Sequence, residues 1–110
     1  MERIHYAGGS VLTGTEIARA LLEYAGALAS TESSATVDIP CRHDDGSLGR
    51  ANFLIGPASQ LVSETEPSDA EELVEPELIE MFAKETAALT GGGVVRPSEP
   101  LGRTEDFDDL

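Results

Sequence analysis

The clearest structural signal in the sequence is ATVDIPCRHDDGSLGRANFLI, residues 35–55. Polar and apolar side chains alternate over residues 35–41 and again over residues 50–55. That two-residue period is typical of strands with one buried face. Asp44-Asp45-Gly46 between the two runs is a turn signal, so the segment predicts a β-hairpin.

The apolar pattern also selects the register of this hairpin. A two-residue turn at Asp45-Gly46 would put polar and apolar side chains on the same face of the sheet. A three-residue loop over 44–46, with Gly46 in the left-handed region of a G1 bulge, avoids this conflict. The register then pairs Ala35 with Ile55, Val37 with Phe53, Ile39 with Ala51 and, on the outer face, Asp38 with Asn52. We expect Pro40 on an edge strand or at a bulge, where its missing N–H costs no ladder bond.

Two helices are predicted, one before and one after the hairpin. The first spans about residues 14–30, because Thr13 and Glu16 have capping-box spacing and apolar side chains follow at helical spacing. The second starts at Glu75-Pro76 and ends at Gly91, with a short helical turn over 68–71 before it. The expected buried stripes are Ile17, Leu21, Tyr24 and Leu28 in the first helix, and Leu78, Phe82 and Leu89 in the second.

Short strands complete the predicted fold. Residues 3–6 suggest an edge strand, followed by a bend over 6–10 that leads into the first helix, and residues 60–65 suggest one more strand. The fold class is therefore α+β: a small antiparallel sheet in β-α-β-β-(β)-α order, packed against two helices in a single domain over 1–90. Residues 91–110 lack any period, and we expect a flexible, disordered acidic tail.

Charge is the most unusual feature of the composition. The formal net charge is −14, with 21 Asp and Glu against 7 Lys and Arg. Nucleic-acid binding depends on clustered basic side chains, so direct nucleic-acid binding is not expected, and docking on anionic membranes is disfavoured for the same reason. The sequence has no apolar run long enough to span a membrane and a single cysteine, and we expect a cytoplasmic protein. The excess of Arg over Lys suggests a GC-rich bacterial genome.

One small group of side chains could support chemistry. Cys41 and His43 lie two residues apart on the hairpin, where they could supply a thiol and a base or two metal ligands. A zinc site needs three or four protein ligands, so a core cysteine beside a solvated turn is the favoured interpretation and no cofactor is expected. The alternative is a small enzyme, or a metal-dependent site, in which Cys41, His43, Arg50 and Tyr6 converge.

Apolar side chains on the outer face of the hairpin favour association instead. Leu48 and Leu54 fall on the face that points away from the predicted core. A small sheet would leave them in contact with water unless another protein covered them. Our first hypothesis is therefore a non-enzymatic module that binds another protein, with a homodimer as one form of that association.

The acidic segments allow a further hypothesis. Glu71, Glu72 and Glu75 belong to the most acidic third of the chain, and a solvated helix face that steers basic partners explains them best. A row of such carboxylates could also mimic a nucleic acid and bind a basic protein. In the tail, Phe107 and Leu110 stand among acids, as anchors of disordered binding segments do.

Overall fold

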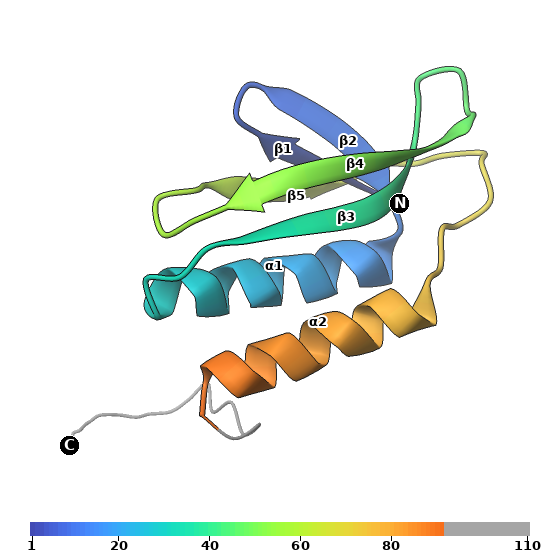
Figure 1. Cartoon of the computed structure of the whole chain (residues 1–110). Helices are drawn as coiled ribbons and strands as arrows, with labels where there is room; N and C mark the ends of the chain where they lie inside the picture. The colour runs from blue at the N-terminus through green and yellow to red at the C-terminus, as the bar shows by residue number, and fades with distance from the viewer. Residues whose placement is uncertain (92–110) are drawn as a thin grey trace.

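The chain forms a five-stranded antiparallel sheet with two helices on one side of it (Figure 1). The structure is a computed structural model, and it describes residues 1–91. The strand order in the sheet is β4-β3-β2-β1-β5. The elements are β1 (Glu2–Tyr6), β2 (Gly9–Thr13), α1 (Thr15–Ser30), β3 (Ala35–Arg42), β4 (Leu48–Ile55), β5 (Leu61–Thr65) and α2 (Pro76–Leu89). The predicted α+β class is confirmed, while the tail over 92–110 lies outside the described residues.

The β3–β4 hairpin has the predicted register. Val37 pairs with Phe53 and Asp38 with Asn52, so the apolar side chains share the inner face. The His43 N–H donates to the Ser47 carbonyl at 2.9 Å, and the Gly46 N–H donates to the His43 carbonyl at 2.8 Å. Gly46 has φ +87°, which confirms the three-residue loop with a left-handed glycine.

Pro40 lies in an interior strand, so its expected place at an edge or a bulge is wrong. β3 has β4 on one side and β2 on the other. The missing N–H is still harmless, because the pair Pro40–Arg50 belongs to the set that exchanges no hydrogen bonds with β4. On the other side, β2 pairs with β3 only between Leu12 and Arg42.

Residues 6–10 connect two strands, and the predicted bend from strand to helix is wrong. Ala7 and Gly8 have φ +51° and +83°, the values of a two-residue type I′ turn, and join β1 to an additional strand β2. The predicted edge position of the strand over 3–6 is also wrong. β1 pairs with β5 as well as with β2, because the chain returns after β4 to add β5 beside it.

The first helix is confirmed, but the predicted capping box is not formed. The Thr13 hydroxyl donates to the Pro40 carbonyl at 2.8 Å and thereby ties β2 to β3. Gly14 takes the N-cap position without a side-chain cap of its own. Instead, the Glu72 carboxylate accepts the Thr15 N–H at 2.6 Å, so a residue far along the chain caps α1.

The second helix begins at Pro76 as predicted, and Gly91 follows its end with φ +82°. The predicted helical turn over 68–71 is wrong, because residues 66–75 run irregularly past the start of α1. That path lets Glu72 cap α1 and buries Leu73 in the core. Local capping-box spacing could not reveal these distant contacts.

The core lies between the sheet and the helices. Tyr24 of α1 stacks on Phe82 of α2 with ring centroids 5.5 Å apart, and Phe82 is fully buried. On the sheet side, Tyr6 meets Phe53 edge to face at 5.1 Å. The inward stripes of both helices match the predicted ones, with Leu89 only partly buried.

Candidate functional site

Strand β4 forms one edge of the sheet that residues 1–91 build. Within residues 1–91, β4 pairs only with β3. Alternate residue pairs of an antiparallel ladder exchange hydrogen bonds. The bond from the His43 N–H to the Ser47 carbonyl identifies His43–Ser47 as such a pair, so every second pair beyond it is also hydrogen-bonded. Gly49, Ala51, Phe53 and Ile55 therefore bond to β3. The N–H and C=O groups of Leu48, Arg50, Asn52 and Leu54 point away from β3.

The side chains of these outward-bonding residues form a short apolar surface with a polar centre. Leu48 is 64% exposed and Leu54 is 65% exposed. Arg50 and Asn52 lie between them on the same face and are also exposed. The predicted exposure of the two leucines agrees with the structure, and both belong to the edge strand rather than to an interior one.

The β4 edge lies in the longest stretch of the chain without an acidic residue. Residues 46–63 contain no Asp or Glu and a single charged side chain, Arg50, although the whole chain carries 21 acids. The Arg50 guanidinium donates to Glu75 at 3.0 Å and to Asp38 at 2.8 Å. Both bonds raise the pKa of Arg50 and hold its side chain across the hairpin.

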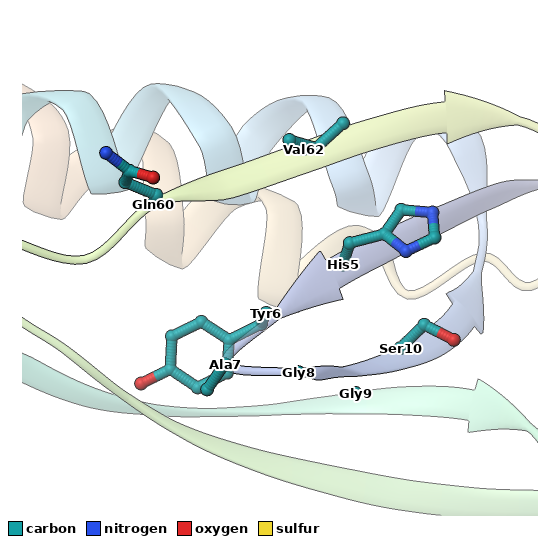
Figure 2. A pocket seen from close by; sticks show the side chains of 8 residues that line it. All are labelled: His5, Tyr6, Ala7, Gly8, Gly9, Ser10, Gln60 and Val62. Carbon is teal, nitrogen blue, oxygen red and sulfur yellow. The ribbon is translucent and has the colours of Figure 1, made fainter.

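The far end of β4 meets the β1–β2 turn. The Tyr6 hydroxyl donates to the Leu54 carbonyl, so one outward group of the edge has a partner within the chain. Figure 2 shows the Tyr6 ring directed away from His5, at one end of an open hollow of about 460 Å³. Gln60 and Val62 of the β5 side line the same hollow.

The group proposed for chemistry comes together only in part. Cys41, His43 and Arg50 line one hollow of about 420 Å³, whereas Tyr6 lines the separate hollow of Figure 2. Cys41 is only 3% exposed, and burial raises the pKa of its thiol, which disfavours the reactive thiolate. His43 lies against Gly49, where an added Cβ would come within 2.2 Å of its Nε2. Among residues 1–91, no three His, Cys, Asp or Glu side chains are placed to hold a metal ion.

The predicted helix face formed by Glu71, Glu72 and Glu75 is wrong, because all three precede α2, and several carboxylates of this segment bond within the chain. Glu72 accepts the Thr15 N–H, Glu75 pairs with Arg50, and Glu66 pairs with Arg3 at 2.6 Å. The Arg3 hydrogen bond lowers the pKa of Glu66, and the Thr15 N–H lowers the pKa of Glu72. Glu71 is exposed, and its carbonyl accepts Arg42 Nη2 at 3.2 Å. Sequence reasoning missed these partners because each lies in a distant segment.

Comparisons with protein-family models, with curated proteins and with solved structures found no match to this chain. In the part of the chain that the structure describes, neither helix has the length and apolar character needed to cross a membrane. The predicted tail anchors, Phe107 and Leu110, lie outside the described residues.

Proposed function

We propose that this chain is a protein-binding module that adds an extended segment of a partner protein to the β4 edge. The observation that carries the proposal is an eight-residue strand that, within residues 1–91, pairs on one side only and has an exposed leucine near each end. Main-chain groups of such an edge provide affinity by strand addition, and side chains on alternate positions provide specificity. Here Leu48 and Leu54 would supply the apolar contacts of the partner strand.

The second edge of the sheet fits this role less well. β5 has five residues, and its face carries Glu64, which binds His5 at 2.9 Å. Charged side chains and short length are the usual protections of an edge strand against pairing. β4 is longer, and the charge of Arg50 is compensated by Asp38 and Glu75.

The test is selection of short extended peptides from a displayed library on the intact chain. Asn52→Pro is the counter-selection variant, because it removes an outward N–H while sparing every hydrogen bond between β3 and β4. We expect binders with apolar residues at alternate positions that lose binding to Asn52→Pro. Selected peptides that bind both proteins equally would contradict the proposal.

A further inference from the structure

We infer that the segment added to β4 is β4 of a second copy of this chain, in an antiparallel register centred on Ala51. This inference rests on the strand addition proposed above and names its partner. It follows from three properties of the described chain: which main-chain groups face outward, which side chains then meet, and how charge is distributed around the edge.

The outward main-chain groups restrict the possible registers. Only Leu48, Arg50, Asn52 and Leu54 can exchange hydrogen bonds with a new strand, so each hydrogen-bonded pair must join two members of this set. Antiparallel pairing of two identical strands about a two-fold axis then leaves three central registers. They are centred on Arg50, on Ala51 or on Asn52.

Side chains distinguish the three registers. Centring on Arg50 would place two guanidinium groups directly opposite each other, which is destabilising. Centring on Asn52 would oppose Arg50 to Leu54 and leave Leu48 without an apolar partner. Centring on Ala51 opposes Leu48 to Leu54 at both ends and Arg50 to Asn52 twice in the middle, so apolar meets apolar and polar meets polar.

Charge favours this edge for self-association. Two copies of a chain with net charge −14 repel each other over most of their surfaces. Residues 46–63 carry no acid, and the two carboxylates that contact this edge, Asp38 and Glu75, are both ion-paired with Arg50, so their charge is offset where the β4 edges approach. The Tyr6 hydroxyl already occupies the Leu54 carbonyl, and the central pairs of Arg50 with Asn52 leave that contact undisturbed.

Single cysteines test the register directly. On a Cys41→Ala background, Ala51→Cys places two thiols opposite each other at a non-hydrogen-bonded pair, where Cα atoms lie about 4.5 Å apart and a disulfide fits. We expect mild oxidation to give a covalent dimer with Ala51→Cys and much less with Arg50→Cys or Asn52→Cys. Preferential cross-linking of Arg50→Cys or Asn52→Cys would overturn the register, because these variants report the two shifted alignments.

Sedimentation of the full chain tests the partner. We expect a monomer–dimer equilibrium whose dissociation constant rises at least about tenfold in Asn52→Pro, since two main-chain hydrogen-bonding positions are lost from the pair. Leu48→Lys with Leu54→Lys should have the same effect without a proline, and Val62→Lys on β5 is the matched control that should leave the dimer intact. Thermal melting of each variant establishes that it folds.

The outcomes separate this inference from the proposed function. A chain that stays monomeric at all concentrations, yet still binds peptides in a manner sensitive to Asn52→Pro, overturns the second copy as partner and keeps strand addition. A dimer that Asn52→Pro and the two leucine substitutions leave unchanged, while Val62→Lys weakens it, places the contact elsewhere and overturns the inference.

Discussion

Gly14 lies where the start of α1 and the segment over 66–75 approach each other closely. It is buried at the N-cap of α1, and the segment before α2 crosses directly over it. A Cβ built on Gly14 would lie 1.9 Å from the Leu73 carbonyl oxygen. Its φ of −70° is open to any residue, so the requirement for glycine is one of space and not of backbone conformation.

Substitution of Gly14 tests this close approach. Gly14→Ala should lower the free energy of unfolding by about 2 kcal/mol or more, because the main chain around Leu73 must move. Gly26→Ala is the matched control: nothing lies within 4 Å of its Cβ, and alanine in α1 should stabilise by about 0.5–1 kcal/mol. Chemical denaturation measures both, and equal effects of the two substitutions would contradict the packing described here.

The contact between Glu72 and the Thr15 N–H at the start of α1 should make the free energy of unfolding depend on pH. The Thr15 N–H lowers the pKa of the folded carboxyl, so its stabilising effect is complete above the unfolded pKa of about 4.3 and is lost as pH falls through the folded pKa. Glu72→Gln should cost about 0.5–1 kcal/mol at pH 7. The difference from wild type should shrink in acid as the carboxyl becomes protonated.

The control for Glu72 is its neighbour Glu71, whose carboxylate is exposed. Glu71→Gln should change the free energy of unfolding at pH 7 by less than about 0.5 kcal/mol. A Glu72→Gln profile parallel to wild type between pH 7 and pH 3 would show that the carboxylate does not cap α1 in solution.

At the scale of elements, Phe82 joins the two helices. It is fully buried and stacks on Tyr24. Phe82→Ala should cost about 3–5 kcal/mol, since both the apolar transfer and the cavity left behind count against folding. Met81→Ala, at an exposed neighbouring position, should cost less than about 1 kcal/mol. Similar losses in denaturant melts of the two variants would argue against α2 as a packed part of the core.

Local pattern was sufficient for the elements that depend on their own sequence. The β3–β4 register follows from alternation and Gly46, both helices follow from their apolar stripes, and α2 follows also from its proline start and the glycine after its end. The second strand of the β1–β2 hairpin was missed because Ala7 takes a left-handed conformation that an alanine does not signal. The capping of α1 and the path of residues 66–75 depend on partners more than fifty residues apart.

The candidate site also has features that local pattern predicts and features that depend on the whole sheet. Alternation along β4 was enough to place Leu48 and Leu54 on an exposed face. That β4 is an edge depends on the strand order of the whole sheet, which places β2 and β1 on the opposite side of β3. Tyr6 could not be excluded from the Cys41 group by sequence alone, because the direction of the β1–β2 hairpin is set by its pairing with β5.

For the whole molecule, charge and association are opposed. The chain carries a net charge of −14, and the proposed dimer brings two such charges together through an edge without acids. Salt screens repulsion beyond about 10 Å at 0.1 M, so raising the ionic strength from about 50 to 500 mM should tighten the dimer by about threefold or more. Sedimentation at several salt concentrations measures this. Weakening by salt would instead indicate an attractive contact between the acidic face and a basic surface.

Amide hydrogen exchange along β4, followed residue by residue at two protein concentrations, shows whether a second β4 covers this edge. The N–H groups of Gly49, Ala51 and Phe53 bond to β3 and should exchange slowly at both concentrations. Those of Arg50 and Asn52 point outward and should exchange fast in dilute solution and slowly at high concentration, where a second β4 covers them. Rates for these two amides that are the same at both concentrations, in samples that sedimentation shows to be monomeric and dimeric, would contradict pairing at the β4 edge.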